Sequence, residues 1–284
     1  MPNVKIEERF VDMGRKIVSV MMTLVLAVAV LAGCAAKTDT SKQFRVGMEA
    51  GYAPFNWTQM DDKNGAVKID GASEYAGGYD VEIAKKLAAG LGKELVIVKV
   101  EWDGLVQMLT SNKIDAIIAG MSPTEERKKT IDFSDNYYKS DLIMVVKKGG
   151  AFENAKTLKD FTGAKITAQL NTFHYSVIDQ IPGVKKETAM SDFPAMRVAL
   201  ESGIIDGYVS ERPEGVSASS ANENFAFVDF TEGFVTSADD TAIAVGVRKG
   251  YDLTSKINEI LTKISEDERI SIMDAAIKNQ PSAK

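Results

Sequence analysis

The sequence predicts an α/β fold whose mainly parallel sheets are divided between two lobes. Short runs rich in β-branched residues alternate with segments in which apolar residues recur every three or four positions, a pattern typical of sheets flanked by helices. One short pattern also occurs twice, at residues 109–116 and 200–207. The chain has 284 residues, which exceeds one small core and suits two lobes.

The predicted strands are short and separated by helical segments. They occupy residues 44–48, 95–100, 114–119, 142–147, 165–168, 205–209, 226–230 and 241–247. Apolar residues at three- and four-residue spacing predict helices over residues 81–91 and 253–264.

The pattern that occurs twice reads Leu-x-Ser-x-x-Ile-Asp-small, beginning at Leu109 and again at Leu200. Each copy is typical of a helix end, a tight turn and a buried strand. Ligands of open α/β sheets gather beyond the carboxyl ends of the strands. Gly120 and Glu211, which follow the two strands, are therefore expected to face one cleft between the lobes.

Composition excludes several classes of function. With 34 Lys and Arg against 40 Asp and Glu, the chain has a net charge of −6, so no nucleic-acid partner is expected. One His and one Cys exclude a multi-histidine zinc site and an internal disulfide. We therefore expect no metal and no cofactor.

Residues 1–33 have the layout of a signal peptide. Arg15 and Lys16 precede the uncharged run 17–32, which is short for a membrane span of roughly 20 residues. The small residues before Cys34 resemble a bacterial lipobox, which implies lipidation of Cys34 and a flexible tether over 34–43. The alternative is a plain apolar anchor in which Cys34 is an ordinary thiol. Met1 and Met13 both remain open as the start.

Four ordered motifs resemble family 3 of the extracellular solute-binding proteins, which serve polar amino-acid ABC transporters. The motifs are Tyr52-Ala53-Pro54-Phe55, Gly78-Tyr79-Asp80-Val81-Glu82-Ile83, the segment from Ala119 to Arg127, and Ile131-Asp132-Phe133-Ser134 with Tyr137-Tyr138. The resemblance spans about residues 44–270 and implies a type II periplasmic-binding-protein fold that closes on one amino acid by hinge motion.

The resemblance also implies how the chain is divided. Two crossover strands are expected near residues 144–147 and 237–242. Lobe 1 then comprises residues 44–144 plus 240–284, and lobe 2 comprises residues 145–239.

The α-carboxylate of an amino acid requires a charged fork and further donors. Arg127, with Ser122 five residues earlier, supplies both, although Arg127 taken alone also suits an exposed charged run. The loop at 169–174 resembles the family's Gly-Thr turn, which implies that Thr172 and Phe173 meet the carboxylate from lobe 2. Asn171 replaces the usual Gly and tolerates positive φ. His174 has no predicted partner.

The α-ammonium requires acceptors, which the Gly120 carbonyl and the Glu211 carboxylate are expected to provide. Many relatives carry Asp where this chain has Glu211. Tyr52 and Trp102 resemble the family's aromatic pair around the ligand's side chain, whereas the alternative places both in the core.

The resemblance also places Glu49 beside the ligand's side chain. Glu49 and Glu211 together set two acids against one Arg, which favours a basic ligand, lysine or arginine, while a glutamine-type ligand stays open.

The predicted function is that of a substrate-binding lipoprotein of an ABC importer, not an enzyme. Its expected partners are an amino acid, the permease and ATPase complex, and the membrane through the N-terminal lipid. We expect a monomer outside the cytoplasm, on a Gram-positive surface or a periplasmic membrane face. Two alternatives stay open: a dehydratase-like enzyme with Glu49 and Glu211 as acid and base, and a sensory module.

Overall fold

The computed structural model describes residues 40–281. The predicted signal peptide, Cys34 and most of the predicted tether lie outside these residues. Within the described part of the chain, a 3-10 turn at Thr40–Lys42 leads directly into the first strand at Gln43.

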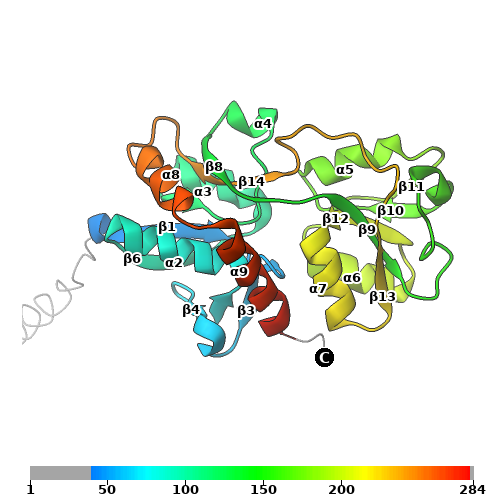
Figure 1. Cartoon of the computed structure of the whole chain (residues 1–284), viewed down its shortest axis with the longest axis horizontal. Coiled ribbons are helices and arrows are strands. Elements are labelled where there is room, and N and C mark those ends of the chain that lie inside the picture. The colour runs from blue at the N-terminus through cyan, green and yellow to red at the C-terminus, as the bar shows by residue number, and fades with distance from the viewer. Residues whose placement is uncertain (1–39, 282–284) are drawn as a thin grey trace, which may run out of the picture. The chain divides into compact units, whose positions relative to one another are not determined.

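Two five-stranded sheets form the framework (Figure 1). The first has the order β6-β1-β7-β14-β8, and we call the part of the chain built around it the first lobe. Its strands are β1 (Gln43–Met48), β6 (Glu94–Lys99), β7 (Ala116–Ile117), β8 (Asp132–Lys139) and β14 (Ala242–Val247). The second, the sheet of the second lobe, has the order β11-β10-β12-β9-β13. Its strands are β9 (Leu142–Lys147), β10 (Lys165–Thr167), β11 (Lys185–Lys186), β12 (Gly207–Glu211) and β13 (Phe225–Val228).

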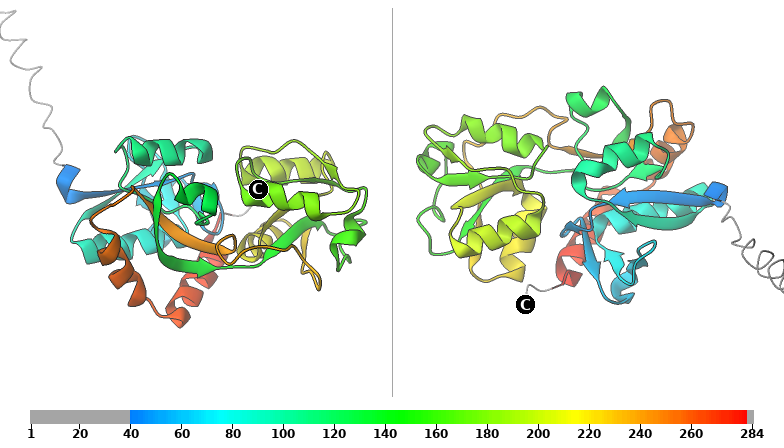
Figure 2. Two further views of the ribbon diagram at one scale, coloured as in Figure 1. Left: turned by 90° about the horizontal axis from the view of Figure 1, so that it is seen from above. Right: turned by 180° about the vertical axis from the view of Figure 1, so that it is seen from behind.

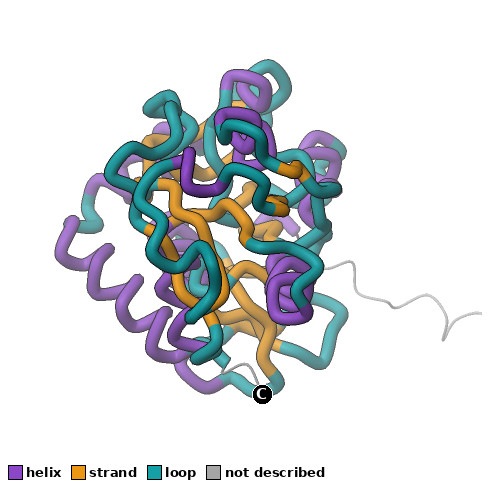
Figure 3. The backbone as a smooth tube through the Cα atoms, turned by 90° about the vertical axis from the view of Figure 1, so that its right-hand side faces the viewer, coloured by secondary structure: helices purple, strands orange, loops and turns teal. Residues whose placement is uncertain are grey.

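Helices flank these sheets, with the strands inside (Figure 3). They are α2 (Tyr79–Leu91), α3 (Leu105–Thr110), α4 (Glu125–Lys128), α5 (Phe173–Val177), α6 (Phe193–Ser202), α7 (Arg212–Ala221), α8 (Thr254–Thr262) and α9 (Glu266–Asn279). Short 3-10 turns lie at Lys63–Gly65, Trp102–Gly104, Leu158–Phe161 and Ile178–Gln180.

The α/β class is confirmed, but the sheets are mixed rather than mainly parallel. In the first sheet β1 runs parallel to β6 and β7, whereas β14 runs antiparallel to β7 and β8. The second sheet repeats this arrangement, with β10 parallel to β11 and β12 and with β9 antiparallel to β12 and β13. The reason is that β9 and β14 enter their sheets straight from the other lobe and not after a helical crossover.

All eight predicted strands are present, with ends shifted by a few residues. The sequence did not predict β8 and β11, nor a small third sheet of β2 (Gly51–Tyr52), β3 (Asn56–Gln59), β4 (Val67–Lys68) and β5 (Tyr75–Gly77). β8 has the sequence Asp-Phe-Ser-Asp-Asn-Tyr-Tyr-Lys, which lacks an apolar run, and the other missed strands have two to four residues. Such short strands carry too little periodicity to be recognised.

The chain crosses between the sheets in two adjacent segments (Figure 2). β8 ends at Lys139 and β9, which pairs in the second sheet along its whole length, begins at Leu142. The return lies between β13 and β14, and the amide of Ser140 donates to the carbonyl of Thr241 at 3.0 Å. Sheet membership therefore favours a first crossing at residues 140–141, slightly before the expected 144–147. The lobe boundaries remain a prediction.

The repeated pattern forms the same structure in both lobes. The carboxylate of Asp115 accepts from the amide of Arg45 at 2.9 Å, and that of Asp206 accepts from the amide of Lys165 at 2.8 Å. In return, each aspartate amide donates to the carbonyl of the same partner at 2.7 Å. These paired bonds dock β7 beside β1 and β12 beside β10, which brings the ends of β7 and β12 into equivalent places.

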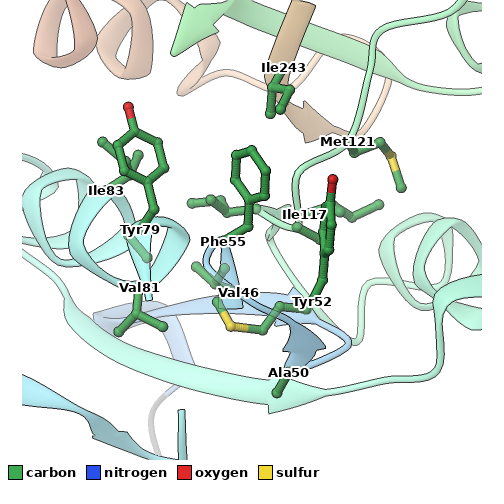
Figure 4. Packing of buried hydrophobic residues seen from close by; sticks show 14 of the residues in the cluster. Val46, Ala50, Tyr52, Phe55, Tyr79, Val81, Ile83, Ile117, Met121 and Ile243 are labelled. Atoms are coloured by element: carbon green, nitrogen blue, oxygen red, sulfur yellow. The ribbon is translucent and has the colours of Figure 1, made fainter. Parts of the chain in front are cut away.

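The core of the first lobe packs α2 and α8 against the first sheet. The predicted apolar face of α2 is buried, and its residues Val81, Ile83 and Leu87 have no exposed surface. Figure 4 shows Phe55 between the rings of Tyr52 and Tyr79, with centroid distances of 4.9 and 6.2 Å. This aromatic cluster connects the core to the loop that carries Tyr52.

We expect Asp115→Ala and Asp206→Ala each to lower the free energy of unfolding by about 1 to 3 kcal/mol, because each leaves a strand amide without its acceptor. Glu223→Ala, at an exposed position, is the matched control and should change stability by less than about 0.5 kcal/mol. Urea denaturation measures all three. A neutral effect of either aspartate substitution would contradict the equivalence of the two copies.

Candidate functional site

A pocket between the two lobes collects residues from the ends of several strands. Its lining is Tyr52, Trp102, Gly120, Ser122, Arg127, Gln169, Thr172, Phe173, His174 and Phe193. Seven of the nine predicted ligand-binding residues are in this lining, and the other two, Glu49 and Glu211, contact it. The sequence did not assign Gln169 or Phe193 to the site.

Gly120 occupies a place that no other residue fits. It follows β7 with φ of +62°, and a Cβ atom there would lie 2.7 Å from the ring of Tyr52. Both the left-handed backbone and the close approach of the ring therefore require glycine. Tyr52 in turn stacks on Phe193, with centroids 4.1 Å apart and planes 11° apart.

Arg127 is fixed by contacts from both lobes. Thr124 caps the one-turn helix α4 by accepting from the Arg127 amide. The guanidinium donates to the carbonyl of Ser122 at 3.0 Å and to that of Asn171 at 3.2 Å, and it lies 4.9 Å from the ring centre of Trp102. Burial lowers the pKa of Arg127 to about 10, so the group remains cationic at neutral pH.

The loop at 169–174 adopts the turn that the sequence predicted. Asn171 has φ of +55°, and its side-chain amide donates to Asp103 across the lobes at 2.8 Å. The hydroxyl of Thr172 donates to the carbonyl of Gln169 at 2.6 Å, within the turn. Asn171 therefore provides the left-handed residue and also a bridge to the first lobe.

Glu211 lies fully buried at the end of β12 and contacts the first lobe. The hydroxyl of Tyr52 donates to its Oε2, and Nε2 of His174 lies 3.0 Å from its Oε1, which is an ion-pair distance without hydrogen-bond geometry. Burial would raise the pKa of Glu211, but His174 and Tyr52 outweigh burial and hold the pKa below its ordinary value. Glu211 is therefore anionic, and His174 has the partner that the sequence did not reveal.

Glu49 is the second acid beside the pocket, and it is 7% exposed. Gln169 donates to its Oε2 at 2.8 Å, while Oε1 is buried without a hydrogen-bond partner in the protein. Burial, opposed by the bond from Gln169 and reinforced by the charges of Asp192, Glu101 and Asp80, raises the pKa of Glu49 to about 8. An acceptor of this kind favours a cationic donor.

The two predicted aromatics are buried to different extents, and Tyr52 lies in the hydrophobic core of the first lobe. Tyr52 is 3% exposed and stacks on Phe193, whereas Trp102 is partly buried and contacts Arg127. Among the described residues that line the pocket, Arg127 is the one permanent cation. The site is therefore a narrow aromatic pocket with one guanidinium and an excess of acid.

Between residues 40 and 281, no helix is both long and apolar enough to span a membrane. The same part of the chain contains no group of three or more His, Cys, Asp or Glu residues placed to hold a metal ion.

Comparison with known proteins identifies the family. The family model for bacterial extracellular solute-binding proteins, family 3, matches residues 44–276. The chain belongs to this family. The arginine-binding extracellular protein ArtP of Bacillus subtilis is 28% identical, over 80% of this chain and 82% of its own length. The match to the family model extends over nearly all of the described residues.

Two solved structures share the two-lobed fold. An amino acid ABC transporter substrate-binding protein from Streptococcus pneumoniae, bound to L-arginine, has a TM-score of 0.74 at 26% identity and covers 84% of this chain and 95% of its own. An ancestral amino-acid-binding protein, described as a precursor of cyclohexadienyl dehydratase, has a TM-score of 0.68 at 27% identity and covers 84% and 96%. The predicted family and fold are thus confirmed.

We expect Gly120→Ala to disrupt the pocket and Gly149→Ala to serve as its matched control. Both glycines have positive φ, but a Cβ at Gly149 meets nothing within 4 Å. The control should therefore lose about 1 kcal/mol of stability from backbone strain alone, and Gly120→Ala should lose about 1 to 3 kcal/mol more as the Tyr52 ring is displaced. Equal losses in urea denaturation would contradict the close packing of Gly120 against Tyr52.

Proposed function

We propose that the protein is the extracytoplasmic substrate-binding component of an ABC importer and captures a polar amino acid, with lysine or arginine favoured. The observation that carries the proposal is the charge of the pocket. Glu49 and Glu211 are buried beside it, one with an unpartnered oxygen, and Arg127 is the single permanent cation among the described lining residues. A zwitterion with a cationic side chain balances these charges once Glu49 is ionised.

The α-carboxylate would bind at Arg127. Two backbone carbonyls orient the guanidinium without neutralising it, since neither carries a charge, so its charge remains available to an anion. Ser122 and Thr172 flank the same part of the pocket, and Phe173 follows Thr172 at the start of α5. The hydroxyls of Ser122 and Thr172 already donate to the carbonyls of Asp240 and Gln169. The donors to the carboxylate would therefore be the guanidinium of the first lobe and the backbone amides of Thr172 and Phe173 from the second.

The α-ammonium would bind between Glu211 and the carbonyl of Gly120. Glu211 is anionic and belongs to the second lobe, whereas Gly120 belongs to the first. The ligand's side chain would pass Tyr52 and Trp102 toward Gln169 and Glu49. The relatives whose names or titles specify arginine support this assignment.

Closure would join the two lobes around the ligand. Several bonds already cross between them: Glu49 with Gln169, Tyr52 with Glu211, Arg127 with Asn171, and Asp103 with Asn171. A ligand that contacts both lobes adds to these bonds only in the closed state and therefore favours it. The closed surface is what a permease with its ATPase would recognise.

The signal peptide and the lipidated Cys34 belong to the same proposal. Lipid on Cys34 would hold the binding domain at the membrane surface, as a Gram-positive lipoprotein or at a periplasmic face. We propose a monomer that acts by binding rather than by catalysis.

One observation favours an enzyme as a second candidate. Glu49 has a raised pKa and Glu211 a lowered one, and two carboxylates whose pKa values are separated suit a general acid and a general base. The similarity to a precursor of cyclohexadienyl dehydratase points the same way. Incubation with each amino acid that binds, followed by NMR, distinguishes the two, because a binding protein returns its ligand unchanged.

The proposal predicts micromolar or tighter binding of arginine or lysine in a calorimetric titration of the protein, refolded to remove bound ligand, against all twenty amino acids. Arg127→Ala should lower the affinity by about 2 to 5 kcal/mol, because the carboxylate loses its charged partner. Arg127→Lys keeps the charge but loses the forked guanidinium, so its affinity should lie between those of the unsubstituted protein and Arg127→Ala. Unchanged affinity in Arg127→Ala would exclude this carboxylate site.

Binding of a basic amino acid should also depend on pH. Glu49, which faces Asp192, Glu101 and Asp80, is protonated in the free protein below its pKa of about 8. A cationic side chain binds the ionised form, so affinity should rise by up to about tenfold per pH unit between pH 6 and 8 and then level off. Glu49→Gln should reduce this dependence and weaken binding. If the affinity of the unsubstituted protein does not change with pH, the ligand's cationic side chain does not bind at Glu49.

A further inference from the structure

The motif Gly78-Tyr79-Asp80 places a carboxylate in the core of the first lobe, and Asp80 is not among the proposed ligand contacts. It lies at the start of α2 with no exposed surface. Among the described residues, no Lys, Arg or His side chain forms an ion pair with it at 4.0 Å or less. A buried carboxylate without a cation is costly, so its hydrogen bonds must account for it.

Two hydrogen bonds hold the Asp80 carboxylate, and both lead to the ligand pocket. The hydroxyl of Tyr137 donates to Oδ1 at 2.7 Å, and the side-chain amide of Asn56 donates to Oδ2 at 2.8 Å. The same Tyr137 oxygen accepts from the amide of Gly120 at 3.3 Å. Asn56 pairs with Tyr52 across β2 and β3. One carboxylate is thus connected to two parts of the pocket wall.

The direction of these bonds depends on the carboxylate. A tyrosine hydroxyl has one proton, and Tyr137 gives it to Asp80, which leaves its oxygen lone pairs for the Gly120 amide. On the other side of Gly120, the carbonyl of Met121 accepts from the amide of Ala244 at 3.1 Å. The Gly120 carbonyl lies between these two anchors, so the Asp80–Tyr137 bond helps to fix its orientation.

We propose that Asp80 is a positioning residue for the α-ammonium site: through Tyr137 it orients the Gly120 peptide, and through Asn56 it supports the strand pair that carries Tyr52. The inference rests on the proposed function, because it concerns the acceptor for the ligand's ammonium group. Burial raises the pKa of Asp80 to about 7, and the bonds from Tyr137 and Asn56, together with the nearby amide of Gly120, oppose this rise, as expected of groups arranged to hold the ionised carboxylate.

Asp80→Asn and Tyr137→Phe test the inference. Asparagine keeps the shape of Asp80 but offers one acceptor oxygen to two donors, and phenylalanine removes the hydroxyl that receives the Gly120 amide. Tyr79→Phe is the matched control, because it removes a buried hydroxyl that donates to the Tyr137 carbonyl at 3.0 Å and has no bond to Gly120. Thermal unfolding of each variant is measured alongside binding.

The readout is a ratio of affinities for two ligands. Calorimetry measures the affinity for arginine or lysine, whichever binds the unsubstituted protein more tightly, and for its analogue without the α-amine. The analogue of arginine is 5-guanidinopentanoate, and that of lysine is 6-aminohexanoate. General damage to the fold weakens both ligands alike, whereas a misplaced ammonium acceptor weakens only the amino acid. The preference for the amino acid should fall about tenfold in Asp80→Asn and Tyr137→Phe and stay unchanged in Tyr79→Phe.

The outcomes separate this inference from the proposed function. If the unsubstituted protein binds none of the twenty amino acids, the proposed function fails and the inference with it. If it binds and the preference is unchanged in both test variants, only the inference is overturned. Should Asp80→Asn fail to fold, Tyr137→Phe decides alone, because Asp80 and its bond from Asn56 are retained there.

Discussion

The site depends on carboxyl groups that are held away from water. Glu49 and Glu211 lie in or beside one pocket, Asp80 lies behind it, and burial raises the pKa of Glu49 and Asp80. Each of these acids accepts hydrogen bonds from neutral groups, which are Gln169 at Glu49, Tyr52 at Glu211, and Tyr137 and Asn56 at Asp80. Ionising Glu49 is costly in the free protein and less costly beside a cation, so under the proposed function the pocket would prefer a positively charged ligand.

The repeated architecture brings these charges together. In each lobe an aspartate docks one strand on its neighbour: Asp115 docks β7 on β1, and Asp206 docks β12 on β10. The carboxylate of each aspartate accepts from the backbone amide of the neighbouring strand, and its own amide donates to the carbonyl of the same residue. The ends of β7 and β12 then lead to Gly120 and Glu211, which line or contact the same pocket from opposite sides. A local hydrogen-bond pattern, used twice, thus places an acceptor on each side of the cleft.

Much of this could be predicted from the sequence. The eight strands with clear apolar runs, the α2 face and the repeated aspartate pattern all depend on local periodicity, which a single chain displays. β8 and the third sheet depend instead on pairing with distant strands, and their residues show no such pattern. The positive φ of Asn171 could be predicted, because an asparagine side chain tolerates it. The contact of His174 with Glu211 could not, because it joins residues far apart in the sequence.

The site illustrates the same division. Motif resemblance brought Arg127, Gly120 and Ser122 into one list, and the structure places them in one pocket. Gln169 follows the strand β10, and Phe193 is the first residue of the helix α6. The rule that ligand contacts lie at strand ends could have found Gln169. Phe193 offers no such signal, because a phenylalanine at the start of an amphipathic helix looks like any core residue until Tyr52 is seen to stack on it.

The extra methylene of Glu211 has a structural consequence. Its carboxylate reaches across the cleft to the hydroxyl of Tyr52 while its other oxygen lies by His174, so both oxygens have a neighbour before any ligand is considered. Under the proposed function, a ligand's ammonium would share Glu211 with groups from both lobes. Glu211 would then contribute to closure through Tyr52 and to ligand binding through its charge, and a shorter aspartate would give up part of the first role. The length of this side chain couples the two.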